Sequence, residues 1–223
     1  MISIEDAVLS RKSCRSFVDR DVDVALIRRV LEKAARAPSN GNLQPWQLYV
    51  VTGESLSELK QMTAAQIDGD NPMDEPEYAV YPKPLKPIYE ARRQAIGEDI
   101  YRVLGIPRED RAGRRRQFAK NGQLFDAPVG IFTYVDRSLS YGQWMDVGMF
   151  LQTVMLLCEG HGLATCAQGY WTFFHHNVRK VTGASDELML ACGLAVGYED
   201  PSEAINSVKA PRASMDDFAQ FRS

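Results

Sequence analysis

The residues best suited to chemistry lie near the two ends of the chain. Arg11, Lys12, Ser13 and Arg15 place two guanidinium groups, an ammonium group and a hydroxyl within five residues. Arginine stays charged at physiological pH and can hold two phosphate oxygens at once. Residues 206–212 return positive charge near the C-terminus. Each segment fits half of a phosphate site, but each also fits a solvated surface, and nothing local brings the two together.

A third polar segment, residues 37–46, joins an expected helix to an expected strand. Ser39, Asn42 and Gln44 offer a hydroxyl and two amides that could address the carbonyl and nitrogen edge of a heterocyclic ring. Glycine and proline in the same segment favour a tight turn. Taken alone, the segment is equally well explained as a turn.

Common catalytic signatures are missing from this sequence. The glycine pair nearest to a dinucleotide fingerprint, Gly160 and Gly162, follows an expected helix, whereas that fingerprint follows a strand. There is no phosphate-binding Walker loop and no serine in a nucleophile elbow. An enzyme without a conspicuous acid, base or nucleophile needs a bound cofactor to carry its reaction.

The composition limits which partners and which metal sites this protein could have. The net charge of -3 offers no broad cationic surface for nucleic acid. The longest apolar stretch, near residues 147–158, is too short to span a membrane, and the N-terminus lacks the pattern of a signal peptide, so a cytoplasmic location is expected. Cys158, His161 and Cys166 lack a fourth ligand at recognisable spacing, so we expect reduced, buried thiols and no metal site.

The periodicity predicts an α+β protein. Ser3 can cap a helix with Ile4, Ala7 and Val8 on one face, and Asp23 or Asp21 can cap a second that ends at Pro38. Residues 145–159 are apolar around most of the helix, which predicts burial on several sides, in the core or at a subunit interface. Further helices are expected after Thr52 and at 88–104 and 108–125, and strands at 48–51, 129–135 and 188–196.

The region after residue 68 changes in character. Five prolines between residues 72 and 87 exclude a persistent helix or central strand there. Irregular segments of this length in a single domain are commonly lids or substrate-facing loops. We therefore expect one domain, residues 1–223, with a lid-like excursion at about 68–125. The positive charge of residues 108–125 is expected to be mainly a solvated face, with residues 114–116 as a candidate reader of a cofactor phosphate.

Four motifs in this order resemble the FMN-dependent nitroreductase family over essentially the full length. They are RKSCRSF, PSNGNLQPW, GLATCAQGYW and KAPR. The middle of the chain, with YPKPLKPIYEARRQ and GQWMDVGMFLQ, is similar to the nitrobenzoate-reductase-like branch. The resemblance implies a central, mostly antiparallel sheet surrounded by helices, and an intertwined homodimer with FMN sites at the subunit interface.

The resemblance also implies a set of cofactor-binding residues. Arg11, Ser13 and Arg15 would reach the phosphate and ribityl end of FMN, and Lys209 and Arg212 would complete the phosphate clamp. Gln168 and Gly169 would bring backbone close to the reactive nitrogen of the ring. The remaining contacts would come from Pro38, Ser39, Asn42 and Gln44, with Pro38 and Ser39 supplied by the partner subunit. A further asparagine and lysine contact of some family members does not align here, so Asn71 and Lys83 are left open.

The reaction that this resemblance implies is a ping-pong transfer of electrons from NAD(P)H through FMN to a small aromatic acceptor, with no catalytic side chain. Alternatives within the superfamily are a reductive dehalogenase, an enone reductase and a flavin-destroying dimethylbenzimidazole synthase. Two further alternatives are a non-catalytic flavin sensor and a helical interaction protein whose basic segments are merely solvated. Candidate walls of the acceptor pocket, each more readily explained by core or interface packing, are Tyr78, Tyr81, Phe118, Phe125, Trp144 and Phe173.

Overall fold

A computed structural model describes residues 2–69 and 73–222. Its centre is one four-stranded antiparallel sheet in the order β1-β2-β4-β3, so the predicted α+β class is confirmed. All three expected strands extend one residue beyond their predicted C-terminal ends, and the first also begins one residue earlier. The strands are β1 (Gln47–Thr52), β2 (Val129–Asp136), β3 (Ala164–Gln168) and β4 (Leu188–Gly197).

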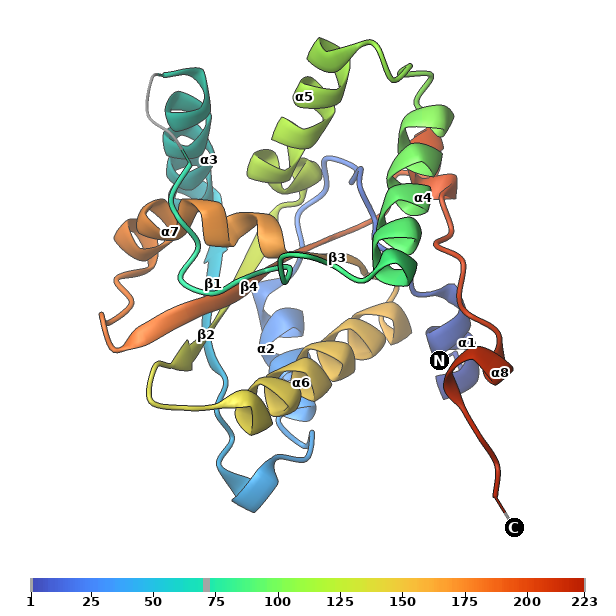
Figure 1. Ribbon diagram of the computed structural model, residues 1–223. Coiled ribbons are helices and arrows are strands. Elements are labelled where there is room, and N and C mark those ends of the chain that lie inside the picture. The colour runs from blue at the N-terminus through green and yellow to red at the C-terminus, as the bar shows by residue number, and fades with distance from the viewer. Residues whose placement is uncertain (1, 70–72, 223) are drawn as a thin grey trace.

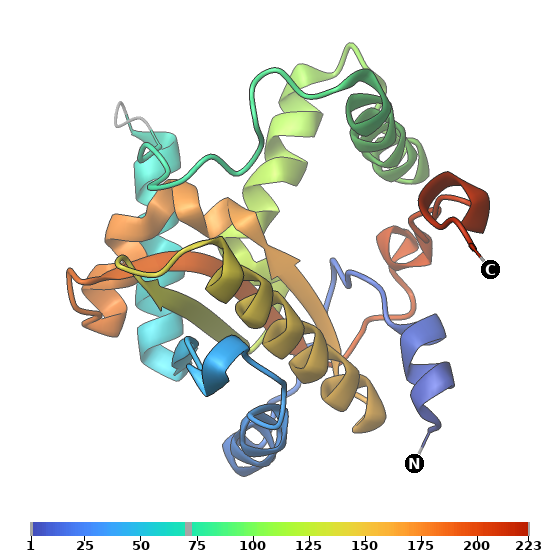
Figure 2. The ribbon, with the colours of Figure 1, turned by 60° about the horizontal axis from the view of Figure 1, so that its bottom comes forward.

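Two hydrophobic clusters cover the two faces of this sheet. Side chains alternate along β2, so that Ile131 belongs to the cluster with α2 (Val24–Ala34) and α6 (Tyr141–Gly160), and Phe132 belongs to the other cluster. The second cluster is completed by α3 (Gly53–Asp68) and α7 (His175–Thr182). Figures 1 and 2 show the resulting three layers, with helices on both sides of the sheet.

The predicted caps are confirmed, but one predicted inner face is wrong. Ser3 caps α1 (Ile4–Ser10) and Asp23 caps α2, each by accepting a backbone hydrogen bond. Of the three residues expected on the inner face of α1, only Ala7 is buried, whereas Ile4 is 82% exposed and Val8 52% exposed. The helix therefore presents apolar side chains outward, because within one chain its neighbours cover only one narrow side.

The helix α6 is likewise only half covered. Val147, Phe150 and Val154 are buried against the sheet, while Met145 is 68% and Met149 40% exposed. The expectation of burial on several sides therefore fails within a single chain. The sequence-based alternative, a subunit interface, still applies to the uncovered side.

The expected helix at 108–125 is shorter than predicted. The helix α5 covers Arg111–Ala119 and is followed by the 3-10 segment η2, Lys120–Asp126, in which Leu124, Phe125 and Asp126 have positive φ angles of 52°, 55° and 71°. Pro128 disfavours a helical conformation at the residue before it, so the chain must turn here to enter β2. Burial of Leu124 and Phe125 in the core compensates for the left-handed backbone.

Sequence reasoning missed β3 and α7. The strand reads ATCAQ, whose small and polar residues carry little strand signal, and it is defined by pairing with β4 from Ala164↔Gly197 to Gln168↔Gly193. The N-terminal segment then lies against β3 through a parallel bridge between Ser13 and Thr165. An unpredicted strand thus positions one of the predicted site segments.

The helices α4 (Pro87–Val103) and α5 stand away from the sheet, and both chain ends lie on one side of the molecule (Figures 1 and 2). The described part of the irregular segment, residues 73–86, contains neither helix nor strand, as expected; Asn71 lies outside the described residues. No described helix is both long and apolar enough to cross a membrane. Short helical segments complete the chain: η1 (Asn40–Asn42), η3 (Gly169–Phe174), η4 (Ala204–Ser207) and α8 (Met215–Phe218).

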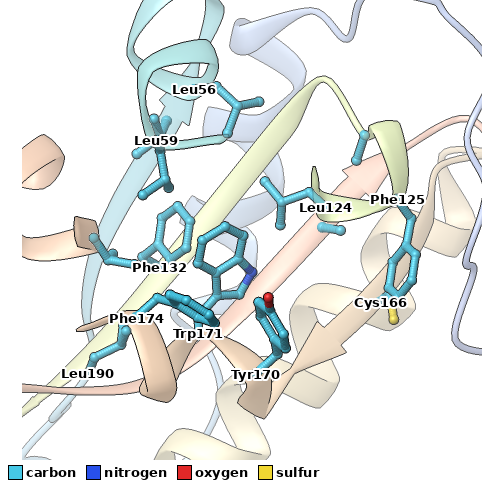
Figure 3. Packing of buried hydrophobic residues seen from close by; sticks show 14 of the residues in the cluster. Leu56, Leu59, Leu124, Phe125, Phe132, Cys166, Tyr170, Trp171, Phe174 and Leu190 are labelled. Carbon is cyan, nitrogen blue, oxygen red and sulfur yellow. The ribbon is translucent and has the colours of Figure 1, made fainter. Parts of the chain in front are cut away.

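Trp171 is a central residue of the core under η3. Its indole is fully buried between Phe132 and Tyr170 (Figure 3). Its Nε1 donates a hydrogen bond to Gln168 Oε1 at 3.2 Å. The indole lies directly over Gly193 of β4, where a β carbon would overlap the ring. Glycine is therefore required at this position for Trp171, and through it for the end of β3.

We predict that Gly193→Ala lowers the free energy of unfolding by about 1–3 kcal/mol, because the added methyl overpacks the core against Trp171. Urea unfolding of the purified protein measures this change. Gly97→Ala is the control, since a β carbon at Gly97 of α4 meets nothing within 4 Å. Equal stability of the two variants would show that Trp171 moves freely.

Candidate functional site

Cationic residues from both ends of the chain line one cavity of about 350 Å³. Arg11, Ser13 and Arg15 come from the segment that follows α1, and Lys209 and Arg212 from the segment that follows η4. These are the five residues expected at the phosphate end of the site. The structure therefore brings together two segments that no local pattern in the sequence connects.

Most of the positive charge in this cavity lacks a partner. Lys12 is paired with Glu199, with Nζ 2.7 Å from Oε1. No carboxylate in residues 2–69 and 73–222 pairs with the other four cations, Arg11, Arg15, Lys209 and Arg212, and no acidic residue is among those lining the cavity. Cations gathered without counter-charges repel one another and attract an anion.

Asn206 holds the two segments at their present separation. Its side chain is 2% exposed and makes three hydrogen bonds. Oδ1 accepts from the Arg15 N–H at 2.8 Å, and Nδ2 donates to the carbonyls of Ser16 at 2.8 Å and Asp200 at 2.9 Å. A neutral amide can be buried between cations without adding charge. Asn206 therefore assembles the cavity without itself being able to bind an anion there.

The strand β3 leads from this cavity to the next predicted contacts. Cys14 N–H donates to the Thr165 carbonyl at 2.9 Å, and Gln168 lies three residues further along the strand, about 10 Å away for extended chain. Gln168 is 3% exposed, and its side chain is occupied by hydrogen bonds with Asn121 and Trp171. The Gln168 side chain is therefore not available to a ligand, and the Gly169 carbonyl accepts from Thr172 Oγ1 at 2.7 Å.

The segment of residues 38–44 lies elsewhere in the same chain. None of Pro38, Ser39, Asn42 and Gln44 lines the cavity, and η1 lies away from α1 in both ribbon views. Asn42 and Gln44 have positive φ angles of 55° and 49°, and Ser39 Oγ accepts from the Gln44 N–H at 3.0 Å. One chain alone therefore does not unite all eleven predicted residues.

A buried carboxylate fixes that segment. Asp146 of α6 is 2% exposed. Both of its carboxylate oxygens accept from the Asn40 N–H, and each lies 3.1 Å from the Asn40 nitrogen. Sequence reasoning missed this residue, although a lone acid in an otherwise apolar helix is an unusual feature with a recognisable signal. Asn206 gave no such signal, because its role depends entirely on distant residues.

The four cysteines are free, and burial opposes their ionisation. It raises the pKa of Cys14 and Cys158 to about 12, and that of Cys166 and Cys192 to about 11. Thiols in this state are poor nucleophiles and poor metal ligands. Their environment agrees with the expectation of structural thiols.

Asp74, His175 and His176 place potential ligand atoms within 4.8 Å of one another. The Asp74 carboxylate, however, accepts from the His176 N–H at 3.0 Å at the start of α7 and lies 3.2 Å from His176 Nδ1. Burial would raise the pKa of Asp74, but these hydrogen bonds and that from Gln66 outweigh it and lower the pKa. The positive end of the helix dipole at the start of α7 also disfavours a bound metal cation. The Asp74 carboxylate is therefore explained as a cap of α7 and not as a metal ligand.

The candidate aromatic walls divide into two sets. Tyr78 donates to the Ala191 carbonyl at 2.6 Å and packs edge-on against Trp144, while Phe173 packs against the core and Tyr81 is 54% exposed. Of these candidates, only Phe118 and Phe125 line a hollow next to Arg15.

Arg114, one of the candidates for binding a cofactor phosphate, instead makes a bidentate ion pair with Glu98.

The antiparallel sheet, its two helical layers and the cationic cavity at the β3 edge define a nitroreductase-type fold with an anion site. The family model described as the Nitroreductase family matches residues 8–198. The chain belongs to this family.

Relatives and solved structures agree with this assignment. The chain is 35% identical over 217 residues to a 4-nitrobenzoate reductase of Pseudomonas putida, covering 97% of this chain and 94% of the relative. It is 33% identical to a chloronitrobenzene nitroreductase of Comamonas testosteroni, covering 98% and 96% of the two chains. The crystal structure of the FMN- and NADPH-dependent nitroreductase NfnB from Sphigopyxis sp. strain HMH matches with a TM-score of 0.95 at 42% identity, over 100% of both chains.

We predict that Asn206→Ala lowers the free energy of unfolding by about 1–3 kcal/mol, because it leaves buried polar backbone groups without partners. Inorganic phosphate should raise the melting temperature of the native protein at constant ionic strength, and should raise that of the variant less. Thermal unfolding of the native protein and of the variant, in phosphate and in chloride, measures the loss of stability and the change in the phosphate effect. Ser207→Ala, at an exposed neighbouring position, is the control. An unchanged phosphate effect in Asn206→Ala would contradict its positioning role.

Proposed function

We propose that this chain is an FMN-dependent oxidoreductase that passes electrons from NAD(P)H to small nitroaromatic acceptors. The observation that carries the proposal is the cavity lined by four cations from both chain ends, none of which pairs with a carboxylate of residues 2–69 and 73–222. The names of the related proteins supply the cofactor and the acceptor class. The cavity supplies the physical reason for a phosphorylated ligand.

The residues present fit FMN. Its phosphate carries up to two negative charges, which Arg11, Lys209 and Arg212 would neutralise by charge-assisted hydrogen bonds. Arg15 and Ser13 would hold the ribityl chain where the segment runs beside β3, and the backbone at Gln168 and Gly169 would meet the ring. The distance of about 10 Å along the strand suits a ligand with a charged end and a flat end.

When bound, FMN supplies reversible two-electron chemistry between NAD(P)H and the acceptor. Two electrons and two protons convert a nitro group to a nitroso group and water. The side chains of this chain would hold the cofactor, and Arg15, beside the ribityl chain, would add positive charge near the ring. The buried, protonated thiols leave the protein without an obvious nucleophile, so we assign no catalytic side chain.

A homodimer explains the uncovered apolar surfaces. Ile4, Val8 and Leu9 of α1 and Met145 and Met149 of α6 are exposed in one chain. A second copy would cover them, since large exposed apolar surface marks an interaction site. Light scattering should then give twice the mass of one chain, and a monomeric mass at micromolar concentration would contradict the proposal.

The partner subunit would also complete the site. The turn that contains Pro38, Ser39, Asn42 and Gln44 is bonded to Asp146 of its own chain through the Asn40 N–H, and none of these four residues lines that chain's cavity. In a dimer, the turn of one subunit would meet the flavin ring held by the other. Four free cysteines are compatible with a reducing compartment, and we propose a cytoplasmic location on that basis.

We predict that Arg212→Ala raises the Kd for FMN about tenfold or more, because it removes a charge-assisted hydrogen bond to the phosphate. Equilibrium dialysis against FMN, followed at the flavin absorption bands, measures this change. Arg222→Ala is the control: Arg222 is an exposed cation of the same C-terminal segment that does not line the cavity. Equal FMN affinity in both variants would contradict the phosphate clamp.

One assay separates the proposed reaction from its alternatives. The purified protein should be yellow, lose its colour with NADPH under nitrogen, and regain it on addition of 4-nitrobenzoate. Turnover of an iodotyrosine, of an enone, or of free reduced FMN under oxygen would instead indicate a dehalogenase, an enone reductase or dimethylbenzimidazole synthase. Bound flavin without turnover of any acceptor would indicate a sensor.

A further inference from the structure

The irregular segment between α3 and α4 runs past α7 on its way to α4 (Figure 1). We call its residues 74–80 the strap. The Asp74 N–H donates to the Phe173 carbonyl at 2.8 Å, and further along the strap the Tyr78 hydroxyl donates to the Ala191 carbonyl of β4 at 2.6 Å. The strap contains neither helix nor strand, so its position depends on contacts of this kind.

The last residues of the strap lie at the ring end of the proposed site. A β carbon placed on Gly169 would be 3.5 Å from Val80 Cγ1, so Val80 lies directly over this glycine. The Tyr78 ring packs edge-on against Trp144 of α6, with ring centroids 4.7 Å apart. Under the proposed function the backbone of Gly169 meets the flavin ring. A shift of the strap would therefore change the space beside that ring.

Glu77 binds the middle of the strap to a cluster of cations. Its side chain is 17% exposed, and its Oε1 accepts a hydrogen bond from Arg137 Nη2. The same oxygen lies 3.8 Å from Arg179 Nη2. Charges that are largely shielded from solvent are screened less than surface charges, so this attraction exceeds that of an ordinary surface ion pair.

The two arginines are themselves fixed to the start of β4. Arg137 Nε donates to the Asp186 carbonyl at 2.6 Å, and Arg137 Nη2 donates to the Leu188 carbonyl at 3.1 Å. Arg179 Nη2 donates to the same Leu188 carbonyl at 2.9 Å. Glu77 therefore ties the strap to the strand whose Ala191 also holds Tyr78.

Charge, more than a full set of hydrogen bonds, holds the Glu77 carboxylate. Its Oε2 lies 3.8 Å from His175 Nδ1, and within residues 2–69 and 73–222 neither of these buried atoms has a hydrogen-bond partner. A buried polar atom without a partner is unfavourable, so the attraction of the cations must offset this cost. An amide of the same shape would keep the unfavourable burial and lose most of the attraction.

We propose that Glu77 is a positioning residue for the reaction: its charge holds the strap in place, so that Tyr78 and Val80 stay beside the ring end of the site. The proposal rests on the proposed function and adds to it a residue that touches neither the cofactor nor the acceptor. Release of Glu77 would loosen the ring end without disturbing the phosphate end, where Arg11, Lys209 and Arg212 lie.

Limited digestion of the holoenzyme with chymotrypsin tests the anchor directly. The enzyme cleaves after aromatic residues, and the bond between Tyr78 and Ala79 becomes accessible when the strap detaches. We expect Glu77→Gln to speed cleavage at this bond about tenfold or more, because local opening controls proteolysis under native conditions. Cleavage after Trp171, which is fully buried in the core, reports global unfolding and should be unchanged.

Asp186→Asn is the matched control for the digestion. The Asp186 carboxylate lies 2.7 Å from Arg179 Nη1, but its side chain is 99% exposed and it lies outside the strap. Its removal takes a negative charge from the same cluster and should leave cleavage after Tyr78 as in the native protein. Equal cleavage rates in Glu77→Gln and the native protein would overturn the anchor. Equal acceleration after Tyr78 and Trp171 would also overturn it, because Glu77 would then serve global stability alone.

Steady-state kinetics test the positioning role. At saturating NADPH, we expect Glu77→Gln to lower kcat/KM for 4-nitrobenzoate about fivefold or more, mainly through KM. Ferricyanide accepts one electron and has no aromatic ring to be enclosed, so its reduction and the FMN content should match those of the native protein. Asp186→Asn should match the native protein with both acceptors.

The two measurements separate this proposal from the proposed function. Faster cleavage after Tyr78 with an unchanged KM for 4-nitrobenzoate would overturn the positioning role, since the strap would then be free without consequence for the site. A native protein that binds no flavin, or that does not oxidise NADPH, would overturn the proposed function and with it the role in the reaction. The digestion would still report whether Glu77 holds the strap.

Discussion

Two of the three hydrogen bonds of the Asn206 side chain join segments that lie 191 and 190 residues apart in the sequence, and the third, to Asp200, fixes the amide within its own segment. Together with the hydrogen bond from the Asp200 N–H to the Ser16 carbonyl and the Lys12–Glu199 pair, they oppose the mutual repulsion of four cations that lack carboxylate partners in the described chain. A neutral amide is suited to this role, since a carboxylate there would neutralise the charge that the cavity needs. The cavity, and every ligand assigned to it, depends on this link between the chain ends.

The fold supports that link from one side. The strand β3 pairs with β4 on one edge and with Ser13 on the other, so the N-terminal cations are attached directly to the sheet. Trp171, packed on Gly193 and bonded to Gln168, fixes the end of the same strand. In the proposed site, this single short strand would carry both the phosphate end and the ring end.

The other side of the site is left incomplete by one chain. The helix α4 has no buried residue, α1 and α6 expose apolar side chains, and the turn fixed by Asp146 lies away from the cavity. These features share one explanation. Under the proposed function, the chain would form part of the enclosure for a ligand, and a ligand together with a second subunit would supply the remainder. Cofactor binding and association would then stabilise the same surfaces, which couples them thermodynamically.

The sequence by itself determined the α+β class, the capped helices at Ser3 and Asp23 and the three apolar strands, because periodicity and capping are local properties. The order of four motifs was enough to indicate the family that the comparisons confirm. Only the tertiary structure decided that Arg11 and Arg212 share a cavity, that ATCAQ is a strand, and that the helix expected to reach residue 125 ends at Ala119. Each of these depends on contacts between distant segments: pairing with β4, burial of Leu124 and the link through Asn206. Such contacts leave no periodic trace in the sequence, because they arise only when the sheet has formed.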